Sequence, residues 1–430
     1  MASTIPPVKG TRDFYPDEMA FRRWLKANLQ AVSEQFGYQE YDGPFLERID
    51  LYAAKSGEEL VKEQSFVFPD RGGDLIALRP ELTPSLARMV ATRRNLLPSN
   101  IRWWSFGPFW RYERPQKGRG REFFQWNIDL LGVDSPQADA EIAAISAAFF
   151  QKVGLKPDQV RIKFNNRRLV DQQLMQLGIK PEQKPLFFRL IDRRDKMKMK
   201  EWETYARELG ASTTQITQLS ELLLQTDAWR ESEELIAFSD ALENLGFQDY
   251  FEYDPTVVRG LDYYTGTVFE ARDSAGNLRA VLGGGRYDNL VSDVGGDPVP
   301  GVGFAMGDMV VRLLLEEYDL IPELRSNPAD VLIASFDESC WKAAFEMSVL
   351  LRSTGLRVEW YPEPARIPKQ LKYAGQQGIP FAVILGPDEI KARQATVKNL
   401  QSREQTTVPF EKAAGTILAG LGSEFDSKDS

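Results

Sequence analysis

The sequence contains no histidine, and Cys340 is the only cysteine among its 430 residues. The missing histidine excludes serine–histidine and cysteine–histidine nucleophile pairs and any imidazole general base. One cysteine without histidine also excludes a Cys/His zinc site and an internal disulfide, which favours a reducing, cytoplasmic location. Any reaction must therefore rely on carboxylates, arginine, lysine, tyrosine and backbone groups.

Long hydrophobic runs and nucleotide-binding glycine motifs are also missing. No apolar run reaches membrane-spanning length, and the first residues, MASTIPPVKGTRDF, lack the apolar core of a secretory signal. Neither a P-loop nor a Rossmann glycine motif occurs, so ATP, if bound, must be held in another way. These absences point to chemistry by positioning and charge stabilisation, such as transfer at phosphorus.

The formal net charge of -9 argues against a protein that coats nucleic acid by bulk attraction. Basic clusters are nevertheless present, and the densest, RPQKGRGR, covers 114–121. A cluster of this kind is either a local binding surface or a solvated face, and the second is the more common case.

The first part of the chain mixes helical and extended patterns. Apolar residues spaced by three and four predict a helix over 18–36, followed by extended chain over 37–47 and a strand over 101–112. Gln125, Asn127 and Asp129 alternate with apolar residues, which places the three polar side chains on one face of a further strand.

Later segments divide the chain. A helical insertion is predicted over about 166–250, a hairpin with strands at 267–272 and 278–282, and a glycine-rich turn leading into an apolar helix over 301–318. The fold class is α+β, with a mostly antiparallel first domain over 1–325 that carries the insertion.

A polar stretch at 322–329 is the expected linker to a second domain. Short apolar runs separated by helix-like segments predict a small α/β domain over 330–421 with mainly parallel strands. The polar residues 422–430 are expected to form a disordered tail.

Two segments carry candidate chemistry. The strand–basic loop–strand pattern over 109–132 can hold a phosphate group, and the alternative is an exposed basic hairpin. The segment VVRGLDYYTGTVFEA over 257–271 is too aromatic for a plain loop. Its alternative is a buried tyrosine pair bridged by an arginine–aspartate contact.

Together these segments resemble the histidyl-tRNA synthetase family, in which histidine is activated with ATP and passed to tRNA. RGLDYYTGTVFE and GGGRYDNL are similar to its two histidine-specific signatures, and RYERPQKGRGREFFQ is similar to class II motif 2. RPELTPSLAR resembles a substrate-binding turn, GYQEYDGPFLE resembles the motif 1 dimer interface, and 330–421 resembles the anticodon-binding domain. The resemblance implies a class II antiparallel catalytic sheet, a homodimer, and tRNA(His), L-histidine and ATP as partners.

The resemblance also implies a role for each matching residue. Arg111, Arg259 and Gln125 would be catalytic, and ATP would be bound by Arg111, Glu113 and Arg259. The implied histidine-binding residues are Glu81, Thr83, Asp129, Tyr263, Tyr264 and Tyr287. The implied tRNA contacts are Gln116, Lys117 and Arg119. Mg²⁺ would accompany ATP, and no residue of this chain is assigned as a metal ligand.

The chain departs from the family pattern at two places. Asp129 stands where most bacterial relatives carry the longer glutamate. In GVGFAMGDMVVRLLLE, which resembles motif 3, Met309 and Val310 replace the usual Glu-Arg, of which the arginine stacks on adenine and the acid helps bind Mg²⁺. Arg312, two positions further along a predicted helix, would face elsewhere.

Two other functions compete with this interpretation. The family includes a non-catalytic paralogue, a regulatory subunit of ATP phosphoribosyltransferase, which typically lacks the anticodon-binding domain and has degenerate signatures. A general RNA-binding protein would explain the basic loops but not the Arg259–Tyr264 signature.

Overall fold

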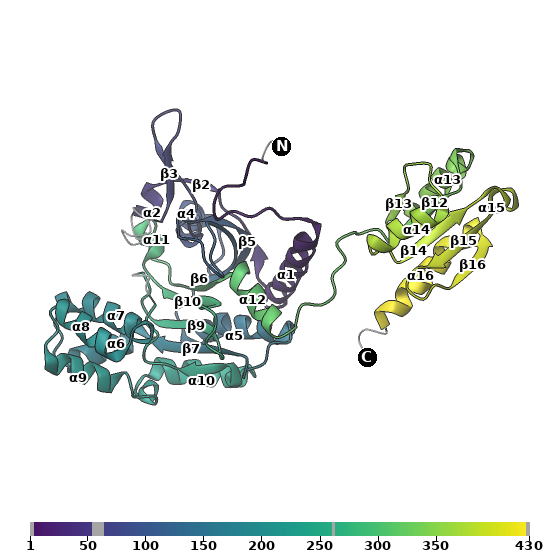
Figure 1. Cartoon of the computed structure of the whole chain (residues 1–430). Coiled ribbons are helices and arrows are strands. Elements are labelled where there is room, and N and C mark those ends of the chain that lie inside the picture. The colour runs from purple at the N-terminus through teal and green to yellow at the C-terminus, as the bar shows by residue number, and fades with distance from the viewer. Residues whose placement is uncertain (1–3, 54–63, 260–262, 427–430) are drawn as a thin grey trace. The chain divides into compact units, whose positions relative to one another are not determined.

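The computed structural model describes residues 4–53, 64–259 and 263–426 (Figure 1). The chain separates into two compact units, Met1–Asp13 with Trp24–Ile321 and Phe14–Arg23 with Pro322–Ser430. The division after Ile321 falls at the start of the stretch that the sequence predicts as a linker. In the described part of the chain, no helix is long and apolar enough to cross a bilayer.

An eight-stranded sheet forms the centre of the first unit, in the order β1-β5-β6-β11-β10-β9-β7-β8. Only the two edge pairs, β1 with β5 and β7 with β8, are parallel; the five inner ladders are antiparallel. The strands are β1 (Gln39–Glu40), β5 (Ile101–Trp110), β6 (Glu122–Leu131), β7 (Val160–Asn166), β8 (Phe251–Tyr253), β9 (Thr267–Asp273), β10 (Leu282–Tyr287) and β11 (Gly301–Gly307). The predicted antiparallel-rich α+β fold is confirmed.

The alternation predicted for β6 separates the core from the opposite face of the sheet. Trp126 and Ile128 are fully buried, and the Trp126 ring packs against Phe149 of helix α5 (Pro136–Lys152), with ring centroids 5.6 Å apart. The Trp126 indole also donates to Ser33 Oγ of helix α1 (Pro16–Gln35), at 3.1 Å. Helices α1 and α5 therefore cover the apolar side of the sheet, and Gln125 and Asp129 point to the other side.

A three-stranded antiparallel sheet and short helices complete the rim of this unit. The sheet order is β2-β4-β3. These elements are β2 (Leu46–Arg48), α2 (Asp50–Ala53), β3 (Phe66–Pro69), β4 (Leu75–Leu78), α4 (Thr83–Arg93), α11 (Leu290–Asp293) and α12 (Asp308–Glu317).

The glycine-rich segments are strands, which corrects two predictions. The second hairpin strand was expected at 278–282, but β10 occupies Leu282–Tyr287 and includes the glycine run. The glycine-rich turn expected before α12 is strand β11. A Cβ at Gly284 would lie 2.5 Å from Phe304 Cβ and 2.7 Å from Phe269 Cζ. Glycine is needed here because the side chains of the neighbouring strands approach the backbone closely. That requirement does not prevent the segment from pairing as a strand.

Four helices of the predicted insertion share a core of their own. They are α6 (Arg167–Gln176), α7 (Lys184–Arg193), α8 (Met199–Glu208) and α9 (Thr213–Leu222), and Phe187, Leu190 and Trp202 lie fully buried between them. Val258 belongs to the same cluster, so the insertion packs directly beside Arg259.

Helix α10 (Glu233–Asn244), which the sequence pattern grouped with the insertion, packs instead on the central sheet. It lies against α5, and the ring of Phe238 sits 5.2 Å from that of Phe164 in β7. Its apolar stripe looked like that of the insertion helices, and only the packing separates them.

The second unit contains a five-stranded sheet in the order β13-β12-β14-β15-β16. Pairing was predicted to be mainly parallel, but only half of the ladders are. Strand β12 pairs in parallel with β13 and β14, whereas β15 pairs antiparallel with β14 and β16. The loop between β15 and β16, residues 400–404, is too short for the crossover that parallel strands need. The strands are β12 (Val331–Ser335), β13 (Val358–Trp360), β14 (Phe381–Leu385), β15 (Gln394–Asn399) and β16 (Gln405–Pro409).

Helices cover this sheet, and the last one reaches into the predicted tail. They are α13 (Trp341–Ser353), α14 (Ile367–Gln376), α15 (Pro387–Ala392) and α16 (Phe410–Asp426). Residues 422–426 of the predicted disordered tail are thus helical, and 427–430 lie outside the described residues.

Candidate active site

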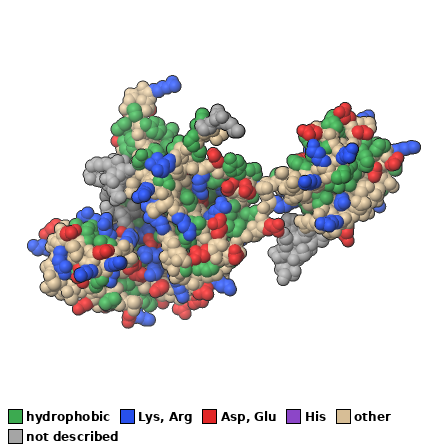
Figure 2. Space-filling model, viewed as in Figure 1, with side chains coloured by type: hydrophobic (Ala, Val, Ile, Leu, Met, Phe, Trp, Pro, Cys, Tyr) green, Lys and Arg blue, Asp and Glu red, His purple; other side chains and the backbone are tan. Residues whose placement is uncertain are grey.

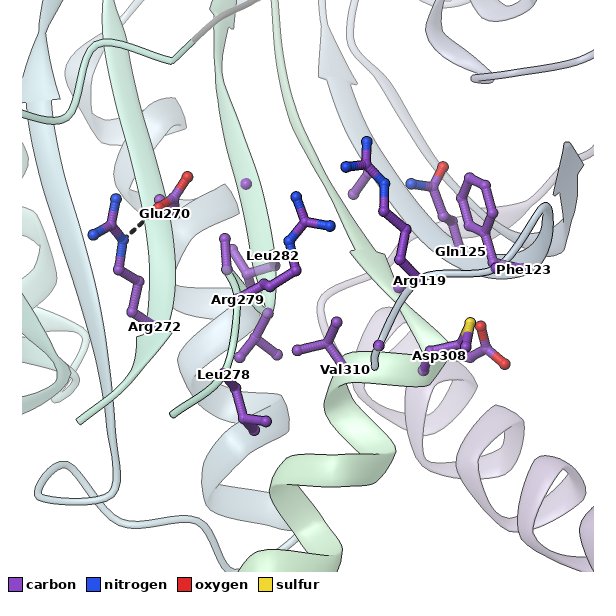
Figure 3. Close-up of a pocket in the computed structure, with 18 of the residues that line it drawn as sticks. Arg119, Phe123, Gln125, Glu270, Arg272, Leu278, Arg279, Leu282, Asp308 and Val310 are labelled. Atoms are coloured by element: carbon purple, nitrogen blue, oxygen red, sulfur yellow. Dashed lines mark hydrogen bonds and ion pairs between the residues drawn. The ribbon is translucent and has the colours of Figure 1, made fainter. Parts of the chain in front are cut away.

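A cleft of about 560 Å³ opens on the polar face of the central sheet of the first unit. Its walls are the basic loop between β5 and β6, the segment before β10 and the start of α12 (Figure 3). Lysine and arginine side chains gather in the hollow between the insertion and the sheet (Figure 2). The charged lining residues are Arg111, Glu113, Arg119, Lys196, Arg259, Glu270, Arg272, Arg279 and Asp308. Cations outnumber carboxylates, so the cleft suits an anionic ligand.

Arg259 is held at one side of this cleft by an ion pair with Glu270 of β9. Glu270 also accepts from Arg272 Nε at 2.6 Å. Burial alone would raise the pKa of Glu270, but the two guanidinium groups outweigh it and hold that pKa below its usual range. The φ angle of Arg259 is 55°, a left-handed conformation that is uncommon outside glycine. A residue keeps such a backbone conformation only where surrounding contacts hold it in place, and the ion pair with Glu270 is one of these contacts.

Arg111 enters the cleft from the end of β5. Its Nε donates to the Pro80 carbonyl at 2.9 Å, and its guanidinium lies over the Phe123 ring, 5.3 Å from the centroid. Burial lowers the pKa of Arg111, and Glu81 opposes that shift. With Nε committed to Pro80, the outer edge of the guanidinium is the part that faces the cleft.

The residues of the basic loop differ in how deeply they are buried. Glu113 is 9 % exposed and forms an ion pair with Arg119, and both side chains line the cleft. Glu113 Oε1 is buried and has no hydrogen-bond partner among the described residues. Gln116 and Lys117 lie at the exposed tip. Arg119, expected beside them as a tRNA contact, thus points into the cleft.

A buried cluster of tyrosines surrounds Asp129. Asp129 Oδ1 accepts from the Tyr287 hydroxyl at 2.5 Å. The Tyr263 ring lies 4.9 Å from the Tyr264 ring and 6.1 Å from the Tyr287 ring. The structure thus brings four of the predicted histidine-binding residues together, and the hydrogen bond of Asp129 joins it to Tyr287.

Asp129 is only 4 % exposed, and burial raises its pKa to about 7, with the Tyr287 hydrogen bond opposing the shift. Near neutral pH this carboxyl is therefore divided between its ionised and protonated forms. A ligand that donates an N–H to it would favour the ionised form.

Glu81 and Thr83 belong to the turn that precedes and begins α4. Glu81 is 6 % exposed and acts electrostatically on Arg111 and on Tyr263, which places its carboxyl between the cleft and the tyrosine cluster. Arg79 fixes this turn, because its buried guanidinium contacts Asp42 Oδ1 at 2.5 Å and the Pro108 carbonyl at 2.9 Å.

The floor between these groups lacks side chains. A Cβ at Gly303 would overlap the Asp129 carboxyl, and one at Gly283 would overlap the Arg259 guanidinium. A Cβ at Gly285 would stand 2.9 Å from Tyr264 Cδ1. The glycines of β10 and β11 therefore leave room for the functional side chains of their neighbours.

At the start of α12 the cleft is lined by Asp308, Met309 and Val310. Asp308 accepts from Arg12 Nη2 and from the Phe124 amide, both at 2.9 Å. Arg312 pairs with Glu316 at 2.8 Å on the exposed side of the helix and does not line the cleft. The expectation that Arg312 faces elsewhere is confirmed.

Several site residues were not predicted from the sequence: Tyr41, Lys196, Glu270, Arg272 and Arg279. Tyr41 packs on Trp103, its ring 5.2 Å away, and its buried hydroxyl has no partner among the described residues. Asp129 acts on it electrostatically, so it borders the tyrosine cluster. Glu270 lies in the quoted signature RGLDYYTGTVFE. Its negative charge, in the same motif as Arg259, could have predicted that the two residues form an ion pair. Tyr41 also lies in a quoted segment, GYQEYDGPFLE, which the resemblance assigned to the dimer interface, whereas Lys196, Arg272 and Arg279 lie outside the quoted motifs.

The raised pKa of Asp129 yields a stability prediction. In the unfolded chain an aspartate titrates near pH 4, whereas Asp129 in the folded chain has a pKa of about 7. Its contribution to stability is therefore complete below about pH 4 and is lost as pH rises to 7. Asp129→Asn keeps an oxygen for Tyr287 and removes the buried charge. We expect the variant to gain stability relative to wild type on going from pH 5 to pH 8, by about 1 kcal/mol or more.

Urea unfolding at both pH values measures this difference. Asp297→Asn, at an exposed position, is the matched control and should show no comparable change. A stability difference for Asp129→Asn that is the same at pH 5 and pH 8 would contradict the raised pKa.

Comparisons with known proteins cover almost the whole chain. The profile of the histidyl-tRNA synthetase family matches residues 10–309, and that of the anticodon-binding domain matches 330–419. A histidine–tRNA ligase from Leptospira biflexa is 35 % identical over 97 % of this chain and 98 % of its own length. A chloroplastic/mitochondrial histidine–tRNA ligase from Arabidopsis thaliana is 37 % identical over 94 % of this chain and 85 % of its own length.

A crystal structure of histidyl-tRNA synthetase from Nostoc sp. PCC 7120 superposes with a TM-score of 0.82 at 26 % identity. It covers 97 % of this chain and 100 % of the Nostoc chain. From the cleft, the buried aspartate–tyrosine cluster, the second unit and these matches, we conclude that the chain belongs to the histidyl-tRNA synthetase family.

Proposed function

We propose that this protein is a histidine–tRNA ligase that acts in the cytoplasm. It would activate L-histidine with ATP to histidyl-adenylate and pyrophosphate, and then esterify tRNA(His). The observation that carries this proposal is the junction of a cationic cleft with the buried Asp129–Tyr287 pair, because ATP and an imidazole would then meet at one place.

The first step needs no protein base. The histidine carboxylate is ionised at neutral pH and can attack the α-phosphorus directly. Its oxygen forms a bond to phosphorus as the bond to pyrophosphate breaks, so the site must align two anions and stabilise growing charge. Arg111 and Arg259 would do this, since both guanidinium groups border the cleft and remain charged.

The amino acid would be fixed at both ends. Glu81 and Thr83 would hold the amino group, Gln125 would hold the substrate end beside the cleft, and Asp129 with the tyrosines would bind the imidazole. A rival amino acid would leave these buried groups unpaired, which costs about 1–3 kcal/mol per group.

Mg²⁺ would accompany ATP. Mg²⁺ usually binds to phosphates and one or two carboxylates, and it would neutralise phosphate charge here. Glu113 fits that requirement, because its Oε1 is buried in the cleft wall and has no hydrogen-bond partner among the described residues. Asp308 fits less well, since both of its oxygens already accept hydrogen bonds.

Transfer to tRNA would use both units. Gln116 and Lys117 at the exposed loop tip are the proposed contacts beside the cleft, while Arg119, paired with Glu113, would face the nucleotide. The domain over 330–421 would bind the anticodon. Its presence disfavours the regulatory-subunit alternative, whose members typically lack this domain.

Histidine-dependent pyrophosphate exchange into ATP tests the activation step. We expect exchange with L-histidine and none with other amino acids. Arg259→Ala should reduce the exchange rate about 100-fold, the usual effect of losing one donor that stabilises transition-state charge, with little change in histidine affinity. Arg312→Ala, outside the cleft, is the control. Near-normal exchange by a folded Arg259→Ala protein would refute the role of Arg259.

Removal of the second unit tests its role in tRNA binding. A chain that ends near Pro322 retains the whole cleft and the core of the first unit. It should still exchange pyrophosphate but should charge tRNA(His) at least tenfold less efficiently, because the anticodon contacts are gone. Charging as efficient as that of the full chain would show that residues 330–421 do not bind the anticodon.

We also propose a homodimer through the small sheet β2-β4-β3. Large apolar side chains are exposed on and next to it: Phe45, Leu46, Val67, Phe68 and Leu75. Exposed apolar patches of this kind mark association surfaces.

A charge placed on this patch should break the dimer. Phe68→Glu, at a residue 40 % exposed, is expected to convert the protein to a monomer at micromolar concentration in sedimentation-velocity experiments. Leu224→Glu, at a residue 76 % exposed in the insertion, should remain dimeric. A wild-type protein that sediments as a monomer would disprove the interface.

A further inference from the structure

The cations of the cleft differ in how they are paired. Five of them contact protein acceptors: Arg111 with the Pro80 carbonyl, Arg119 with Glu113, Lys196 with Asp192, Arg259 with Glu270, and Arg272 with Glu270 and Asp195. Arg279 makes no hydrogen bond, ion pair or ring contact with any residue that the structure describes. It is also exposed, so its guanidinium remains available to a ligand.

Arg279 occupies the apolar end of the cleft. It comes from the segment between β9 and β10, and Leu278, Leu282 and Val310 lie around it (Figure 3). Its side chain reaches across the opening towards Arg119, and the ring of Phe123 lies beyond. A planar cation, an aromatic ring and aliphatic side chains are the groups that favour a flat heteroaromatic ligand.

The two ends of the cleft suit different parts of one nucleotide. Phosphates would lie by Arg111 and Arg259, next to the buried cluster that holds Asp129. The base would then fall at the apolar end. Met309 and Val310 present no charge to it from the start of α12, so Arg279 is the cation that can reach a base from the opposite wall.

We propose that Arg279 stacks on the adenine base of ATP and is the base-binding cation of this enzyme. This inference rests on the proposed function, because it takes ATP as the ligand of the cleft. The residue acts on nucleotide binding, and the groups that stabilise the reacting phosphate are separate from it.

Steady-state exchange kinetics and competition by adenosine test this proposal. Arg279→Ala should raise the KM for ATP roughly tenfold, a change that corresponds to one cation–π contact, with kcat and the histidine KM altered less than twofold. Adenosine carries the base but no phosphate, and its inhibition constant should rise by a similar factor. Arg279→Lys should fall between the two, because an ammonium keeps the charge but not the plane.

Arg312→Ala removes an arginine that lies outside the cleft, and both constants should stay at wild-type values. An Arg279→Ala enzyme with an unchanged KM for ATP would overturn the proposal. A raised KM for ATP with unchanged adenosine inhibition would also overturn it, since Arg279 would then contact phosphate.

Failure of the proposed function can be told apart from failure of this inference. If the wild-type protein shows no histidine-dependent exchange, the function is wrong. Calorimetric titration of ATP and adenosine into wild type and Arg279→Ala then still decides whether Arg279 binds the base.

Discussion

Space on the polar face of the central sheet is the constraint on which the site depends. Two charged groups, the partly buried Arg259 guanidinium and the buried Asp129 carboxyl, occupy positions where a Cβ of Gly283 or Gly303 would stand. Any side chain at those glycines would push one group out of place. On the polar face, the glycines of these strands contribute no side-chain packing. The opposite face is buried by helices α1 and α5.

Charge on that face is balanced unevenly. Glu270 holds Arg259 and Arg272, and Glu113 holds Arg119, so part of the positive charge is neutralised before a ligand arrives. The remaining cations give the cleft its preference for an anion. Asp129 shows the opposite situation, because burial raises its pKa to about 7 and its hydrogen-bond partner is the Tyr287 hydroxyl, which carries no positive charge. The proposed activation step would need no histidine, since these groups would orient the reactants and stabilise charge without transferring a proton.

The insertion takes part in the site although it has its own core. Val258 packs in that core next to Arg259, and Lys196 reaches the cleft from the turn after α7. The left-handed backbone at Arg259 is thus supported from outside the sheet. At the start of α12, Met309 and Val310 present no charge to the cleft. Arg279 lies on the opposite wall and has no protein partner among the described residues.

Local pattern in the sequence determined the family, the alternation of β6 and the helix of residues 16–35, because periodicity and dense motifs are readable without neighbours. The same reasoning misplaced the glycine strands and grouped α10 with the insertion, since a glycine signals close approach without saying what approaches. Only the tertiary structure decided which groups pair. It placed Tyr287 on Asp129 and Glu270 on Arg259, turned Arg119 inward and gave Arg279 no partner among the described residues, because such contacts join segments that are distant in the chain.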